Sequence, residues 1–100
     1  MTLMQTQYAL AALAALAQES RLAIFRLLVQ AGPDGLAASK IAGHLAIAPS
    51  SLSFHLKELS HAQLVTARQE GRFIIYAAQM DSMNALIGFL TENCCGGAPC

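Results

Sequence analysis

The stretch "SFHLKELSHAQLV", Ser53–Val65, decides how this chain folds. Together with the residue just before it, this stretch brings leucines to positions 52, 56 and 59. That spacing repeats on one face of an α-helix, whereas a strand would alternate apolar and polar residues. We therefore predict a helix over residues 50–61, with Leu52, Leu56 and Leu59 facing the core.

A shorter helical segment precedes this helix and is separated from it by a tight turn. Its inner face carries Ile41, Ala42 and Leu45, and "AIAP", residues 46–49, ends it because proline cannot continue a helix. Two short helices joined in this way have the form of a helix-turn-helix, here predicted at residues 36–64. An earlier helix is expected to begin at Ser20, a good N-cap residue, and to end at "AGPDG", residues 31–35.

The segment after the helix-turn-helix, "LVTARQEGRFIIYAA", is rich in β-branched and aromatic residues and has Gly71 near its middle. This pattern predicts a β-hairpin, a wing over residues 64–77. A last helix is expected at residues 81–93, followed by a short tail at 94–100. The fold class is therefore α+β, mainly helical: residues 1–100 form a single winged helix-turn-helix domain.

The first and last helices are unusually apolar. The run "YALAALAALA", residues 8–17, is apolar on nearly every side, and such a helix must be buried. The last helix carries Met83, Leu86, Ile87 and Leu90. A chain this short cannot cover the apolar faces of both helices by itself. We therefore predict a homodimer with these two helices as its interface.

The same alanine-rich run has to be tested as a targeting segment. No lysine or arginine precedes it, whereas a secretory signal needs a positive n-region. It is also shorter than the roughly 20 apolar residues that span a bilayer. We expect a cytoplasmic protein with no membrane partner.

Charge is balanced over the whole chain, at a formal net value of +0, but it is unevenly distributed. Residues 36–77 hold four lysines and arginines against two glutamates, giving +2, together with all three histidines. The rest of the chain is therefore −2. A modest positive excess on the helix-turn-helix and wing is compatible with a nucleic-acid surface, without indicating one by itself.

The predicted surface for DNA lies on the outer face of the 50–61 helix and on the wing. The candidate residues are Lys40, Ser50, Ser51, Ser53, Phe54, His55, Lys57, Arg68 and Arg72. Serine and lysine suit base edges or phosphates, an exposed phenylalanine can touch a thymine methyl, and an arginine at a wing turn can enter the minor groove. Two alternatives stay open: His55 is either a base contact or a half-buried histidine bonded within the fold, and the two arginines that bracket the wing turn are either DNA contacts or solvated charges.

All three cysteines fall in the final seven positions, at Cys94, Cys95 and Cys100. Thiolates bind soft ions preferentially. Trivalent arsenic or antimony is fully coordinated by three sulfurs, whereas zinc in proteins takes four ligands. Gly96 and Gly97 can end the helix so that the adjacent thiols reach one ion. We predict an As(III) or Sb(III) site, with a redox switch, another thiophilic metal or incidental cysteines as alternatives.

Three stretches together resemble the winged-helix repressors of the ArsR/SmtB metalloregulatory family. They are "SRLAIFRLL" (Ser20–Leu28), "SFHLKELSHAQLV" (Ser53–Val65) and "EGRFIIY" (Glu70–Tyr76). The resemblance implies a dimeric repressor on a palindromic double-stranded operator, released when an inducer binds. It also keeps His55 as a DNA-facing candidate.

The chain departs from two patterns of that family. "AASK" stands where one arsenic site places two cysteines, and "DSMNALIGFLTEN" lacks the histidines of the zinc site on the last helix. "CCGGAPC" instead resembles members with cysteines at the C-terminus. A thiol enzyme is not expected, because the tail has no basic residue and the chain has no Cys-x5-Arg or Cys-x-x-Cys motif.

Overall fold

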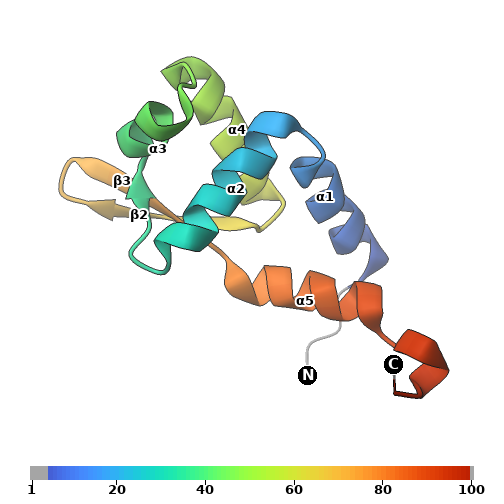
Figure 1. Cartoon of the computed structure of the whole chain (residues 1–100). Coiled ribbons are helices and arrows are strands. Elements are labelled where there is room, and N and C mark those ends of the chain that lie inside the picture. Colours follow the sequence, from blue (N-terminus) through green and yellow to red (C-terminus); the bar gives the residue numbers. More distant parts are fainter. Residues whose placement is uncertain (1–4, 100) are drawn as a thin grey trace.

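The computed structural model describes residues 5–99, which form a winged helix-turn-helix (Figure 1). The elements are α1 (Thr6–Leu16), α2 (Glu19–Ala31), β1 (Leu36–Ala37), α3 (Ala38–Leu45), α4 (Pro49–His61), β2 (Val65–Glu70), β3 (Phe73–Ala78), α5 (Met80–Thr91) and a 3-10 turn, η1 (Cys94–Gly97). In the described part of the chain no helix is long and apolar enough to cross a bilayer.

The helix-turn-helix is built as its leucine spacing predicts. Leu52, Leu56 and Leu59 are at most 2% exposed, so the stripe on α4 is the inner face. Ala46 ends α3 in a left-handed conformation, with φ 54°, and Pro49 begins α4, where a missing N–H costs nothing. The predicted bounds of α4 are confirmed to within one residue.

The wing is a hairpin of β2 and β3, paired from Val65 opposite Ala78 to Glu70 opposite Phe73. It spans residues 65–78, against the predicted 64–77, and its turn is Gly71-Arg72. The sequence reading missed a third strand. The two-residue β1 pairs with β3 on the side away from β2, giving the order β1-β3-β2.

Gly35 makes this third strand possible. It has φ +69°, and a Cβ at this position would collide with the carbonyl oxygen of Tyr76 on β3. Only glycine lets the chain pass so close to the strand it is about to join.

The N-cap of helix α2 lies two residues earlier than expected. Gln18, not Ser20, is the N-cap residue: its side-chain oxygen accepts a hydrogen bond from the backbone N–H of Arg21 at 2.9 Å. Ser20 lies inside the first turn. The helix buries Ile24, Phe25 and Leu28 against the rest of the core.

Helix α1 is only half buried in this chain, so the full burial expected of it would need the predicted second subunit. Ala9 and Ala12 face the core at 2% exposure, whereas Leu10 is 60% and Leu13 39% exposed. The small methyl groups allow close packing against the core. The leucines are left on the outside.

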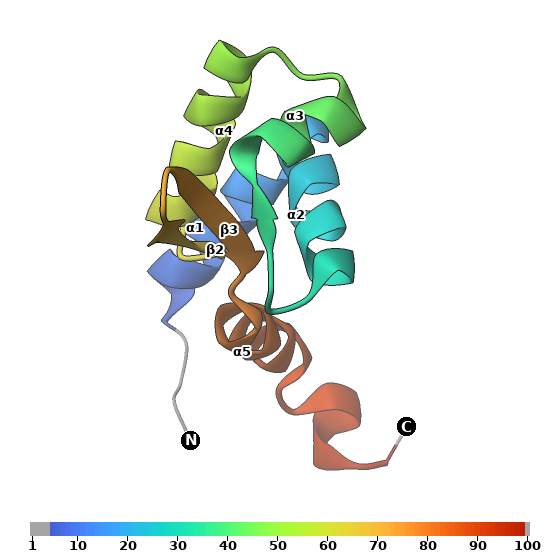
Figure 2. The same cartoon turned by 90° about the vertical axis from the view of Figure 1, so that its left-hand side faces the viewer.

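Helix α5 is likewise buried on one side and leaves large apolar side chains exposed on the other. Leu86 is 3% exposed, but Ile87 and Leu90 are 52% and 58% exposed. Helix α5 contacts α1. In both views α3 and the start of α4 lie at the top, while α5 and η1 lie at the bottom (Figures 1 and 2).

Candidate nucleic-acid interface and thiol site

The outer face of α4 presents the side chains that the sequence predicts. Those of Ser50, Ser51, Ser53, Phe54 and Lys57 are all exposed. Phe54 is 55% exposed, although it is large and apolar. An apolar side chain among short hydroxyls on a protruding helix matches the edge of a base pair, where a thymine methyl lies beside hydrogen-bonding groups.

His55 has a partner inside the fold. Its Nδ1 lies 3.3 Å from Nη1 of Arg21 on α2, and its ring meets Phe54 edge to face with centroids 5.7 Å apart. The side chain is half-buried. Of the two roles left open for His55, the structure supplies the internal hydrogen bond; a direct DNA contact stays a prediction.

Arg21 is a residue that the sequence reading missed. Its Nε donates to the carbonyl oxygen of Ala15 at 2.7 Å, so a single guanidinium joins the end of α1 to α4. It also lines a hollow of about 330 Å³ between α1 and α4, together with Glu58 and His61. Arg21 lies in the stretch that carries the family resemblance, which was the available signal.

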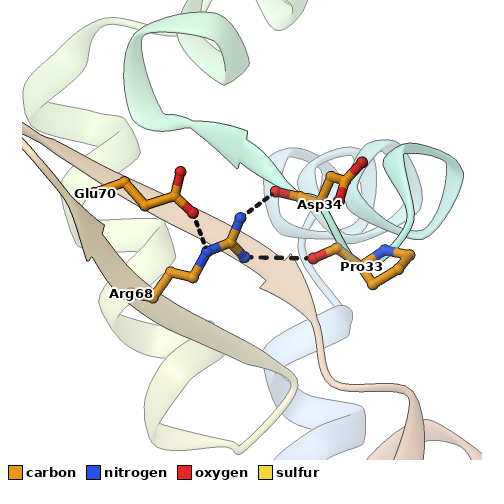
Figure 3. Close-up of polar contacts among 4 residues, drawn as sticks. All are labelled: Pro33, Asp34, Arg68 and Glu70. Atoms are coloured by element: carbon orange, nitrogen blue, oxygen red, sulfur yellow. Dashed lines mark hydrogen bonds and ion pairs between the residues drawn. The ribbon is translucent and has the colours of Figure 1, made fainter.

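The wing arginines do not play equivalent roles. Arg72 is at the tip, in the turn, and exposed. Arg68 lies inside β2 and does not flank the turn, which corrects the predicted placement (Figure 3). Its guanidinium donates to the carbonyl oxygens of Asp34, at 2.7 Å, and Pro33, at 3.3 Å, and pairs with Glu70 at 2.5 Å.

The wing also carries apolar surface. Phe73 is 59% and Ile74 41% exposed at the start of β3, next to the tip. The sequence reading placed both in a strand without assigning them to a site.

Lys40 lies on α3 and is exposed. With Ser39, Gly43 and His44 it lines a shallow hollow of about 300 Å³ on the outer side of that helix. A hydroxyl, an ammonium and an imidazole around a dent suit a phosphate oxygen.

The helix before the cysteines ends earlier than predicted, and not at the glycines that follow them. Helix α5 ends at Thr91, before the glycines, and Asn93 takes a left-handed conformation with φ 57°. The Sγ atoms of Cys94 and Cys95 lie 3.9 Å apart, and both residues are exposed. Cys95 takes part in a disulfide bond.

The third predicted ligand, Cys100, lies outside the described residues. Within residues 5–99 no group of three or more histidine, cysteine, aspartate or glutamate side chains is placed to hold a metal ion.

Comparison with known proteins identifies the fold and the family. A family model described as a helix-turn-helix domain matches residues 16–68. No curated protein matches the chain.

Solved structures resemble the chain over most of its length. An ArsR-like transcriptional regulator from Rhodococcus sp. RHA1 is 26% identical, with TM-score 0.77, covering 91% of this chain and 82% of its own. A possible transcriptional regulator for arsenical resistance is 28% identical, with TM-score 0.69, covering 79% of each chain. The homodimeric winged helix-turn-helix DNA-binding domain of a possible ArsR-family regulator from Mycobacterium bovis is 26% identical, with TM-score 0.70, covering 92% of this chain and 85% of its own.

All three are described as transcriptional regulators or possible transcriptional regulators. The matched segment covers α2, the helix-turn-helix and the first four residues of β2, and it contains the leucine stripe and most of the exposed polar face. The chain belongs to the helix-turn-helix domain family, and its winged-helix fold is similar to those of an ArsR-like and a possible ArsR-family transcriptional regulator.

Proposed function

We propose that this protein is a dimeric repressor that leaves its operator when trivalent arsenic or antimony binds Cys94, Cys95 and Cys100. The observation that carries the DNA-binding part is the exposed face of α4, with Phe54 among serines and Lys57 beside it. In this proposal α4 enters the major groove, Arg72 reaches the adjacent minor groove from the wing tip, and Lys40 meets a phosphate.

Dimerisation is supported by the apolar surface that α1 and α5 leave uncovered. Tyr8, Leu10, Leu13, Ile87 and Leu90 are between 39% and 60% exposed. Exposed apolar side chains gathered on two contacting helices mark an interaction surface. A two-fold dimer would set its two α4 helices about 34–36 Å apart, one turn of duplex, and would require an inverted-repeat operator.

The thiol part rests on geometry and on a relative. An ion bound by thiolates lies about 2.3 Å from each sulfur, so sulfurs up to about 4.6 Å apart can share one ion. The Cys94 and Cys95 sulfurs, 3.9 Å apart, meet this condition once the disulfide at Cys95 is reduced. A similar structure is that of a possible regulator for arsenical resistance.

The site must act on DNA binding at a distance. The cysteine tail and the helix-turn-helix lie at opposite ends of the molecule (Figures 1 and 2). The tail follows α5, the proposed interface helix. Ligand binding there would change the orientation of one subunit relative to the other, and with it the spacing of the two α4 helices. Release requires that the ion bind the DNA-free dimer more tightly than the DNA-bound dimer.

The test is fluorescence anisotropy on an operator selected from random duplexes by the reduced wild-type protein. Arsenite should release the wild type, and each of Cys94→Ser, Cys95→Ser and Cys100→Ser should resist release if three sulfurs bind. A silent Cys100→Ser would reduce the site to the adjacent pair. Operator binding that ignores arsenite in fully reduced protein would contradict the arsenic proposal and leave the DNA-binding part standing.

A redox input is a second candidate, favoured by the disulfide at Cys95. In that case a mild oxidant would release the operator, arsenite would not, and a thiol reductant would restore binding. The same anisotropy assay separates the two inputs.

A further inference from the structure

One guanidinium ties three helices together beside the DNA-facing surface. Arg21, near the start of α2, donates from Nε to the Ala15 carbonyl at the end of α1 and contacts His55 Nδ1 on α4. The Ala15 bond, at 2.7 Å, satisfies a carbonyl that a helix end would otherwise leave without a partner. Arg21 is thereby fixed in place before it meets His55.

The Arg21 contact fixes the chemical form of His55. A guanidinium has only donors, so the nitrogen that faces it must be the acceptor. Nδ1 is therefore unprotonated, and the neutral ring carries its hydrogen on Nε2. His55 can offer its surroundings a single N–H donor and no acceptor.

That donor is open to solvent. In the described part of the chain no side-chain nitrogen or oxygen is buried without a hydrogen-bond partner. The hydrogen bond of His55 within residues 5–99 goes through Nδ1 to Arg21, so Nε2 must be accessible.

The position of His55 on α4 decides what Nε2–H can meet. Leu52 and Leu59, three residues before and four after it, are buried, so His55 lies on the flank of the helix and not on its outermost line. Side chains on the flank of a helix in the major groove pass the sugar-phosphate backbone, whereas the outermost ones face the bases.

We propose that Arg21 is a positioning residue that holds His55 in the Nε2–H form, and that this uncharged donor bonds a phosphate oxygen beside the major groove. The proposal rests on the proposed DNA-binding function for its phosphate partner. The arrangement of Arg21 and His55 stands without DNA.

The first arm of the test needs no DNA. Two-bond ¹H–¹⁵N correlation spectra of the wild type should give Nδ1 the chemical shift of an unprotonated nitrogen and Nε2 that of a protonated one at neutral pH. In Arg21→Met both nitrogens should move toward averaged values as the two tautomers mix. Arg26→Met, a change on the exposed side of the same helix, should leave the His55 signals in place. A wild-type ring protonated at Nδ1 would overturn the proposal.

The second arm measures operator affinity. An asparagine at position 55 can still offer Arg21 an acceptor but has no atom where Nε2 was, whereas a glutamine places an amide nitrogen near it. His55→Asn should weaken binding by about tenfold per subunit, as for a lost hydrogen bond to a charged group, and His55→Gln should restore part of it. The loss should be equal on operator and unrelated duplexes, because a phosphate contact carries no sequence information.

Salt dependence then separates a neutral donor from a cation. His55→Asn should leave the slope of log K against log salt unchanged, whereas Lys57→Gln should lower its magnitude by about one per subunit. A salt-dependence slope of smaller magnitude in His55→Asn would mean that a charged imidazolium binds the phosphate, and would overturn the proposal.

A double-mutant cycle tests whether Arg21 acts through His55. Arg21→Met should weaken DNA binding in the wild-type background and have little further effect in His55→Asn, measured where circular dichroism shows every variant folded. Full additivity would make Arg21 a general stabiliser and reject the positioning role. If the wild type selects no DNA, the proposed function and the phosphate contact fail together, while the spectra still decide the tautomer.

Discussion

The guanidinium of Arg68 on β2 donates to the carbonyl oxygen of Asp34, 2.7 Å away, in the turn that leads into β1 (Figure 3). These two residues are 34 positions apart in sequence, and β1 lies on the other side of β3. Arg68 therefore fastens the wing strand to the turn that precedes the helix-turn-helix.

Loss of this fastening should lower stability without removing a DNA contact. Arg68→Met should reduce the free energy of unfolding by about 1 kcal/mol, since the bonds are at the surface. Arg72→Met, at the wing tip, should leave the unfolding midpoint unchanged and weaken operator binding. Urea denaturation and anisotropy on both variants check this; the reverse assignment of effects would show that Arg68 is the DNA contact.

Gly35 should tolerate no side chain. Gly35→Ala places a methyl group against the Tyr76 carbonyl at a positive φ, and the φ alone costs about 1–2 kcal/mol. The matched control is Gly43→Ala, where the added methyl group meets open space within a helix. This control should gain up to about 1 kcal/mol. Thermal unfolding compares them, and an unaffected Gly35→Ala would mean that β1 does not pair with β3 in solution.

The exposed leucines of α1 and α5 should hold the dimer together. Leu10→Ser combined with Leu90→Ser should give a folded monomer, because both side chains are more than half exposed in the single chain. Its operator affinity should fall by orders of magnitude, since one subunit makes only half of the contacts. Val29→Ser, an exposed apolar residue on α2, is the control. Sedimentation velocity that finds both proteins dimeric would place the interface elsewhere.

Phe54 should determine sequence preference, with little effect on stability. It is 55% exposed, so Phe54→Ala should leave the unfolding midpoint nearly unchanged. It should relax selection for one thymine in each half-site, by about 1–3 kcal/mol for the mismatched pair. Selection from random duplexes by wild type and variant measures this, and identical consensus sequences would exclude Phe54 as a base contact.

Local patterns predicted most of the fold. The leucine spacing of α4, the proline that begins it and the β-branched wing are properties of neighbouring residues, and the structure confirms them. The exposed serines, Phe54 and Lys57 followed from the same spacing, since the outer face of a helix is fixed once its inner face is known.

Contacts between distant residues could not be predicted in this way. The bonds of Arg68 to the Pro33 and Asp34 carbonyls, the Arg21–His55 bond and the pairing of β1 each join positions more than 30 residues apart. The inner face of helix α1 could not be predicted for another reason: its pattern is apolar on all sides, so it does not indicate that the alanines, and not the leucines, face the core.

The distance between η1 and the helix-turn-helix affects how a regulator of this fold could come to respond to a different ion. Since η1 and the helix-turn-helix lie at opposite ends of the molecule (Figure 2), under the proposed function the cysteine-containing segment can be exchanged for another ligand set without rebuilding α4. If the proposed metal response holds, a chimaera carrying a different coordinating tail should keep its operator and respond to a new ion, as a modular biosensor would.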